Sequence, residues 1–84
     1  MNVLLVDDDP EIRLLVGYLL RSAGHDVVEV GSAASARAAL EARPPDVVLM
    51  DVMLGEEDGI DTAADLFGSM AGEPPTLIFL TAST

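Results

Sequence analysis

Three aspartates follow short apolar segments of the chain, and their positions suggest a divalent metal site. Asp7 and Asp8 come directly after residues 3–6, and Asp51 comes directly after residues 47–50. If both segments are parallel strands, their carboxyl ends open at one edge of a sheet, where open α/β folds bind ligands. Crowded carboxylates repel one another unless a cation joins them, and Mg²⁺ prefers such hard oxygen ligands. We therefore expect Mg²⁺ to bind there.

A carboxylate beside bound Mg²⁺ can attack phosphorus and form an acyl phosphate. Thr81 directly follows a further apolar segment, residues 77–80, so its hydroxyl could donate a hydrogen bond to a phosphoryl oxygen. Positioning supplies most of the catalysis in phosphoryl transfer, so a few well-held oxygens suffice. These residue types are typical of a site that handles a phosphoryl group.

Four apolar segments predict the strands that would position these residues. They cover residues 3–6, 27–30, 47–50 and 77–80, and their starts lie roughly 20 to 30 residues apart, a spacing that suits crossover connections. Their nearly continuous apolar character indicates burial on both faces, as in a parallel sheet. Right-handed crossovers between such strands predict an open, doubly wound α/β fold.

Helical patterns fill the gaps between these segments. Asp9 suits the cap of a first helix that starts at Pro10 and ends near Gly24, and Ser32 and Asp58 suit the caps of the second and third. Apolar spacing predicts which side chains each helix buries. For the first helix they are Ile12, Leu15, Val16, Leu19 and Leu20; for the second, Ala36, Ala39 and Leu40; for the third, Ile60, Ala63, Ala64 and Phe67.

Composition excludes several classes of function. The chain has 84 residues, which predicts a single domain over residues 1–84, and it carries a net charge of -11 with arginine as its only cation besides His25 and the amino terminus. Such a chain repels nucleic acid and anionic lipid, so we expect neither as a direct partner. It has no cysteine, signal peptide or long apolar run, which favours a cytoplasmic protein.

Four short motifs resemble those of response-regulator receiver domains from two-component signalling. Residues 4–9 resemble the opening of that family, residues 46–51 its phosphoacceptor strand, residues 58–59 the start of its third helix, and residues 80–82 its switch strand. Together they span the whole chain in the family's order. The resemblance implies a flavodoxin-like strand order, 2-1-3-4, without the fifth strand and last helices of a complete receiver.

The same resemblance implies roles for individual residues. Asp51 would accept a phosphoryl group from the phosphohistidine of a sensor histidine kinase. Asp8 and Asp51 would coordinate Mg²⁺, with Asp7 acting directly or through a water, and Met53 would offer its backbone carbonyl. Thr81 would turn toward the new phosphoryl group. The chain would thus be a phosphoacceptor signalling protein, not an enzyme acting on other substrates.

The chain also departs from the family's pattern. Gly55 stands where the family usually has proline, and the family's invariant lysine, which follows a fifth strand, has no counterpart. A complete receiver runs to about 120 residues, an ordinary domain size, so we expect this receiver to be incomplete at its carboxyl end. An uncovered fourth strand or bare sheet face would then favour self-association, including exchange of elements between copies.

Two other functions remain open on the sequence alone. The chain could be a truncated or pseudo-receiver that is never phosphorylated and serves only in protein–protein interaction or dimerisation. It could also be an aspartyl phosphatase on a similar sheet, although that family resembles this chain less, because it needs a second acid where Met53 stands. His25 fits a solvated turn better than a catalytic role.

Overall fold

The computed structural model describes residues 1–54, 57–68 and 72–80. Its elements are β1 (Asn2–Val6), α1 (Pro10–Ser22), β2 (Asp26–Val30), α2 (Ala33–Ala42), β3 (Val47–Asp51), β4 (Met53–Leu54), β5 (Glu57–Asp58), α3 (Gly59–Gly68) and β6 (Thr76–Leu80). Gly55, the departure in the loop after Asp51, and Thr81, the expected contact of the phosphoryl group, lie outside the described residues.

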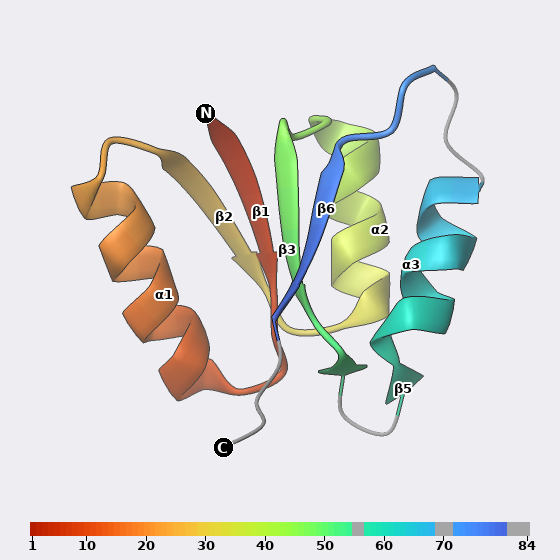
Figure 1. Cartoon of the computed structure of the whole chain (residues 1–84), viewed down its shortest axis with the longest axis horizontal. Coiled ribbons are helices and arrows are strands. Elements are labelled where there is room, and N and C mark those ends of the chain that lie inside the picture. Colours follow the sequence, from red (N-terminus) through yellow and green to blue (C-terminus); the bar gives the residue numbers. More distant parts are fainter. Residues whose placement is uncertain (55–56, 69–71, 81–84) are drawn as a thin grey trace.

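The long strands form one parallel sheet in the order β2-β1-β3-β6. Helix α1 covers one side of this sheet, and α2 and α3 cover the other (Figure 1). Since β6 is the fourth of the predicted strands, the predicted doubly wound order is confirmed. The sequence did not predict β4 and β5, which form a separate two-residue antiparallel pair between β3 and α3.

The main core lies between the sheet and the two helices α2 and α3. It buries alternate strand residues against short helical side chains, and its buried members are Leu4, Val6, Ala36, Leu40, Val48, Met50, Leu54, Ala63 and Leu66. Side chains one position along each strand point to the opposite face of the sheet, toward α1. Because the core holds the strands in place, it also holds the loops at their carboxyl ends, which carry the aspartates.

The helix caps are those that the sequence predicts. The side chain of Asp9 accepts from the backbone N–H of Glu11, and that of Ser32 accepts from the backbone N–H of Ser35 at 3.1 Å. Asp58 lies in β5 and accepts from the N–H of Ile60 at 2.8 Å, so it caps α3 from one residue before the helix. Each cap satisfies an N–H group that the first helical turn leaves without a partner.

The prediction for the buried face of α1 is wrong in part. Val16 and Leu20 are half-buried, but Ile12, Leu15 and Leu19 are 39%, 56% and 56% exposed. The reason is that α1 packs mainly on β2 and less on β1, so among the described elements its flank toward β3 and β6 is little covered. Helical periodicity identifies an apolar stripe but cannot tell whether another element covers it.

The predicted face of α3 is rotated by about one residue. Ile60 is 54% exposed, whereas Thr62, Ala63 and Leu66 are buried. At the start of this helix, Gly59 packs directly on the backbone of Asp51 and Val52. No helix in the described part of the chain could cross a bilayer, which takes about 20 apolar residues.

Candidate metal centre

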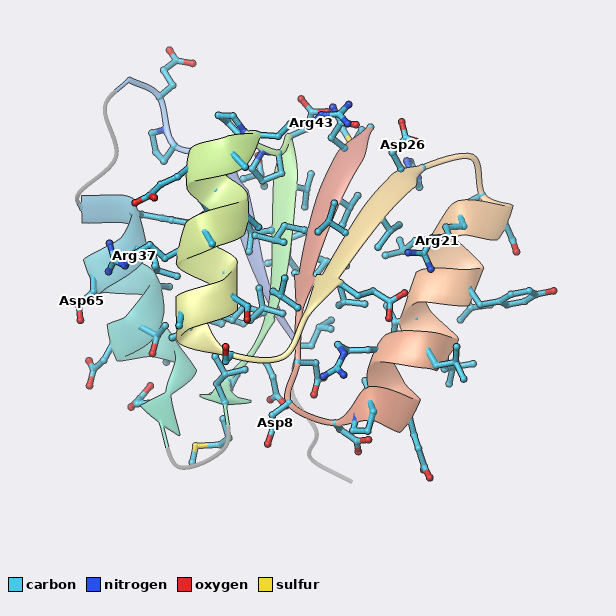
Figure 2. The ribbon with its side chains drawn as sticks, turned by 180° about the vertical axis from the view of Figure 1, so that it is seen from behind. Asp8, Arg21, Asp26, Arg37, Arg43 and Asp65 are labelled. Atoms are coloured by element: carbon cyan, nitrogen blue, oxygen red, sulfur yellow. The ribbon has the colours of Figure 1, made fainter. Side chains whose placement is uncertain are left out.

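Asp7, Asp8 and Asp51 meet at the carboxyl ends of β1 and β3. Each offers a carboxylate oxygen, and these oxygens lie within 4.8 Å of one another. Asp7 and Asp51 are buried, with 3% and 8% of their surface exposed, while Asp8 faces solvent. Figure 2 shows Asp8 at the end of the sheet where α1 begins, far from Asp26 and Arg43 at the opposite end.

Asp7 is held firmly by hydrogen bonds of its backbone and side chain. Its N–H donates to the carbonyl oxygen of Val30 at 3.1 Å, which ties the end of β1 to the end of β2. Its Oδ1 accepts from the N–H of Asp9 at 2.9 Å. The side chain of Asp7 is therefore held by Asp9, the residue that also caps α1.

The surroundings of Asp7 disfavour its charged form. Burial away from water raises the pKa of Asp7, and only the hydrogen bond from Asp9 opposes this by lowering it. Repulsion from the negative charges of Asp51, Asp8 and Asp9 raises the pKa further. A buried carboxylate with raised pKa among other carboxylates gains from a nearby cation, which favours the charged form.

Asp51 is oriented by the loop that follows it. Its Oδ1 accepts from the N–H of Met53 at 3.1 Å. Gly59 donates its N–H to the carbonyl of Val52 at 2.7 Å, and a Cβ at position 59 would overlap the backbone carbonyl of Asp51. The end of β3 and the residue after it are thus in backbone contact with the start of α3. The sequence marked Gly59 as a helix start but did not reveal this contact.

The other predicted site residues are only partly located. Leu80 is the register partner of Asp51, and its carbonyl accepts from the N–H of Val52 at 3.1 Å. Thr81, the next residue, lies outside the described part. Met53 is 58% exposed in β4, and the role of its carbonyl as a ligand stays a prediction.

Sequence reasoning also missed one cation near the acidic group. Arg13 lies one turn into α1 and donates from Nη1 to the backbone carbonyl of Asp7 at 2.6 Å. No signal in the linear sequence places this arginine, because the contact depends on how α1 returns across the end of β1.

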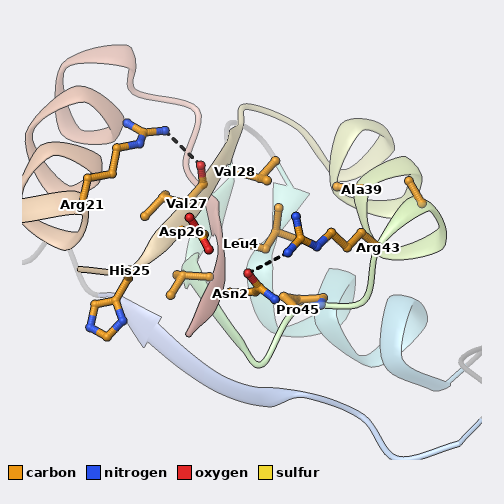
Figure 3. Close-up of a pocket in the computed structure, with 12 residues that line it drawn as sticks. Asn2, Leu4, Arg21, His25, Asp26, Val27, Val28, Ala39, Arg43 and Pro45 are labelled. Carbon is orange, nitrogen blue, oxygen red and sulfur yellow. Dashed lines mark hydrogen bonds between the residues drawn. The ribbon is translucent and has the colours of Figure 1, made fainter. Parts of the chain in front are cut away.

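A groove of about 490 Å³ lies at the other end of the sheet, around the start of β2 (Figure 3). Two of its polar side chains are engaged in structural hydrogen bonds: Arg21 donates to the carbonyl of Val27 at 3.0 Å, and Arg43 donates to Oδ1 of Asn2 at 3.1 Å. In open α/β sheets ligands bind beyond the carboxyl ends of the strands. We therefore assign the chemistry to the acidic group and not to this groove.

Comparison with known families identifies the family to which this fold belongs. The family model described as the response regulator receiver domain matches residues 3–84. The chain belongs to the response-regulator receiver family. The acidic group of this receiver therefore occupies the edge where the resemblance in sequence predicts it.

Individual relatives agree with this assignment. The chain is 37% identical over 78 residues to the probable transcriptional regulatory protein TcrX of Mycobacterium tuberculosis, covering 93% of this chain and 33% of TcrX. It is 37% identical over 83 residues to the DNA-binding response regulator MtrA of Mycolicibacterium smegmatis, covering 99% of this chain and 35% of MtrA. The receiver thus spans about a third of the curated relatives that it matches.

A solved receiver has the same arrangement of strands and helices. The BeF3-activated N-terminal receiver domain of RstA from Klebsiella pneumoniae superimposes with a TM-score of 0.83 and 31% identity. The match covers 100% of this chain and 69% of the RstA chain. The likeness supports a receiver-type signalling module.

Proposed function

We propose that this receiver accepts a phosphoryl group on Asp51 from the phosphohistidine of a sensor histidine kinase, with Mg²⁺ at Asp7, Asp8 and Asp51. The observation that supports this most directly is the meeting of three carboxylates at the carboxyl ends of β1 and β3. We further propose that residues 1–84 act as one receiver unit that signals through its phosphorylation state and is not an enzyme acting on other substrates.

The donor set fits Mg²⁺. Carboxylate oxygens are hard ligands, and Mg²⁺ in phosphoryl-transfer sites is commonly held by one or two carboxylates together with a phosphoryl oxygen and waters. When bound, the ion neutralises charge on the phosphoryl oxygens during transfer. The two buried aspartates would be fixed ligands, while exposed Asp8 can adjust its position. The carbonyl of Met53 is a further proposed ligand.

The reaction itself asks little of the protein beyond positioning. An oxygen of Asp51 forms a bond to phosphorus while the bond from phosphorus to the histidine nitrogen of the donor breaks, and the histidine leaves as neutral imidazole after taking up a proton. The hydrogen bond from Met53 N–H to Oδ1 holds the carboxylate in one orientation. Thr81 would donate its hydroxyl to the transferred group. Holding such groups in place is the main source of catalysis in phosphoryl transfer.

A phosphorylation assay tests this proposal. The full chain is incubated with acetyl phosphate and Mg²⁺, and its intact mass is measured. We expect the wild type to gain the mass of one phosphoryl group and Asp51→Asn to gain none. Asp46→Asn is the matched control, because Asp46 precedes the same strand at its other end and accepts from the N–H of Asn2. An equal adduct on Asp51→Asn would overturn the proposal.

A second candidate function, self-association without phosphorylation, is favoured by one surface. Ile12, Leu15 and Leu19 on α1 and Ile78 on β6 are exposed on the α1 side of the sheet. Leu77 and Phe79 pack against the core on the other side, so alternation directs Ile78 toward the α1 side. An apolar patch shared by two elements is typical of an interaction surface.

The distribution of charge favours a second copy as the occupant of this surface. The chain carries 15 acidic residues, yet residues 12–25 and 76–80, the segments that carry the exposed patch, contain none. Over the rest of the surface, two copies that each carry a net charge of -11 would repel one another. A folded chain that self-associates and gains no phosphoryl group from acetyl phosphate would support this second candidate over the first.

A further inference from the structure

Arg13 contacts the acidic loop directly, through a short hydrogen bond. Its Nη1 donates to the backbone carbonyl oxygen of Asp7 at 2.6 Å. The side chain is partly buried, on the edge of α1 that faces the sheet. A charged donor makes a stronger hydrogen bond than a neutral one, especially away from bulk water.

Gly31 provides the space in which this guanidinium lies. A Cβ built at position 31 would be 2.8 Å from Nη1 of Arg13, 3.4 Å from its Cζ, and 3.8 Å from the carbonyl oxygen of Asp7. Gly31 follows β2 directly and precedes Ser32, the cap of α2. A side chain at position 31 would therefore displace the guanidinium of Arg13 from this place.

These contacts hold Asp7 from three directions. Val30 accepts from its N–H, Arg13 donates to its carbonyl, and Asp9 donates to its carboxylate. Val30 ends β2, whereas Arg13 lies in α1 and Asp9 caps that helix. The peptide before Asp8 is thus fixed to two neighbouring elements.

We propose that Arg13, seated against Gly31, is a positioning residue that holds the loop of Asp7 and Asp8 in the geometry that Mg²⁺ requires. This inference rests on the proposed function, because it assigns a role in the same metal site. Arg13 acts through the backbone of Asp7 and does not touch the ion. Groups that orient metal ligands in this way typically contribute tenfold to a hundredfold to metal affinity.

Positioning and simple charge make opposite predictions for Arg13. A positive charge near a cation site repels the cation, so by Coulomb's law alone its removal should strengthen Mg²⁺ binding. If Arg13 instead positions the ligands, its removal weakens binding, because the carboxylates repel one another and spread apart. The direction of the change therefore distinguishes the two effects.

The choice of ion gives a second distinction. Mg²⁺ demands a nearly ideal octahedral arrangement, whereas Ca²⁺ accepts irregular and flexible ligand sets. A loosened loop should therefore lose affinity for Mg²⁺ more than for Ca²⁺. A variant that is merely less stable, but folded under the conditions of the measurement, would not change the ratio of the two affinities.

The test uses the full chain, three variants of the contact and one control variant. Arg13→Met removes the guanidinium, Arg13→Lys keeps the charge but not the fork of donors, and Gly31→Ala keeps Arg13 but fills its seat. Alanine at position 31 needs no unusual backbone, because only Gly24 and Gly72 have positive φ in the described part of the chain. Arg43→Met is the control for losing one positive charge, since Arg43 contacts Asn2 at the opposite end of the sheet.

Mg²⁺ and Ca²⁺ affinities are measured by calorimetric titration, and amide exchange of Asp9 is measured without metal. We expect Arg13→Met and Gly31→Ala to weaken Mg²⁺ binding on the order of tenfold, to lower the ratio of Mg²⁺ to Ca²⁺ affinity, and to speed exchange of the Asp9 amide. In each of these three measurements, Arg13→Lys should give a value between those of the two variants and that of the wild type. Arg43→Met should match the wild type.

Unchanged or tighter Mg²⁺ binding in Arg13→Met, with unchanged exchange at Asp9, would overturn the inference. So would equal losses for Mg²⁺ and Ca²⁺ in both Arg13→Met and Gly31→Ala. A wild-type chain that binds no Mg²⁺ would overturn the proposed function instead. In that case the metal-free exchange of Asp9 still decides whether Arg13 and Gly31 hold the loop.

Discussion

The carboxylates of Asp7 and Asp51 come from neighbouring parallel strands and reach within 4.8 Å of each other, although both residues are buried. In register, Val6 pairs with Met50, so the two aspartates follow paired residues directly. The pairing of β1 with β3 therefore brings them together as part of forming the sheet. Folding creates a concentration of negative charge that only a proton or a cation can relieve.

Mg²⁺ should stabilise the folded chain through this group. Binding only to the folded state raises the free energy of unfolding by about 2.7 kcal/mol when the ion is present at a hundredfold excess over its dissociation constant. We expect Mg²⁺ to raise the melting temperature of the wild type, and Asp8→Asn and Asp51→Asn to reduce or remove that rise. Thermal unfolding with and without Mg²⁺ measures both effects.

Asp46→Asn serves as the control, because it removes one carboxylate of the same strand region outside the acidic group. Its response to Mg²⁺ should equal that of the wild type. If Asp8→Asn, Asp51→Asn and Asp46→Asn all respond to Mg²⁺ as the wild type does, the proposed metal site is wrong.

Asp7 should make stability depend on pH in ion-free buffer. Burial raises the pKa of Asp7 in the folded state above its value of about 3.9 in an unfolded chain. Between those two values the folded state binds more protons, so the contribution of Asp7 to stability is lost as pH rises through the window. It is fully present only below the unfolded pKa.

Asp7→Asn isolates this contribution, because asparagine can still accept from the N–H of Asp9 but does not titrate. We expect Asp7→Asn to become more stable relative to the wild type as pH rises from about 4, the ordinary aspartate pKa, toward neutral, and to lose the stabilising effect of Mg²⁺. Urea unfolding at several pH values measures the difference. Parallel pH profiles for the two proteins would contradict the raised pKa.

Much of this arrangement follows from local sequence. Asp9, Ser32 and Asp58 act as the predicted caps, because a cap needs only a short polar side chain at the right offset. The four main strands were predictable because burial on both faces leaves nearly continuous apolar segments. Because Asp7 and Asp51 stand at the carboxyl ends of two of these strands, their parallel arrangement alone places both residues at one edge of the sheet.

What the sequence did not reveal depends on contacts between distant segments. The exposure of Leu15 and Leu19 reflects which strands α1 covers, and the seat of Arg13 depends on a glycine that is 18 positions away along the chain, at position 31. The β4–β5 pair is two residues long on each side, too short for an alternating pattern to be recognised. Such features arise only when helices and strands have packed.

Gly59 should tolerate no side chain. A Cβ there would overlap the carbonyl of Asp51 and lie 2.7 Å from that of Val52, and both are backbone atoms at the end of β3. We expect Gly59→Ala to lower the free energy of unfolding by about 2 to 3 kcal/mol, at the upper end for overpacking. It should also slow phosphorylation from acetyl phosphate in the fraction that remains folded.

Gly68 provides the matched control, since it ends the same helix and a Cβ there would meet nothing within 4 Å. Alanine has the higher helix propensity, so Gly68→Ala should leave the stability unchanged or raise it by up to about 1 kcal/mol. Denaturant unfolding compares the two variants. A loss of stability in Gly68→Ala as large as in Gly59→Ala would show that general helix perturbation, and not the contact with Asp51, is responsible.

The exposed apolar patch of α1 and β6 should control the oligomeric state. Leu19 lies on the flank of α1 toward β3 and β6. Leu14 lies on the opposite flank, together with Tyr18 one turn later and with Arg21, whose side chain reaches β2 at the edge of the sheet. A glutamate placed within the patch would meet the same charge from the second copy. We therefore expect Leu19→Glu to shift sedimentation toward monomer.

Leu14→Glu introduces the same charge at a residue that is 70% exposed, compared with 56% for Leu19, but on the other flank. It should leave the sedimentation profile of the wild type unchanged. Ile78→Glu, which changes β6 instead of α1, should act like Leu19→Glu if both elements contribute to one contact. A wild type that sediments as a monomer at high concentration, or a Leu14→Glu variant that dissociates as readily as Leu19→Glu, would contradict an interface at this patch. Dissociation by Leu19→Glu but not by Ile78→Glu would restrict the contact to α1.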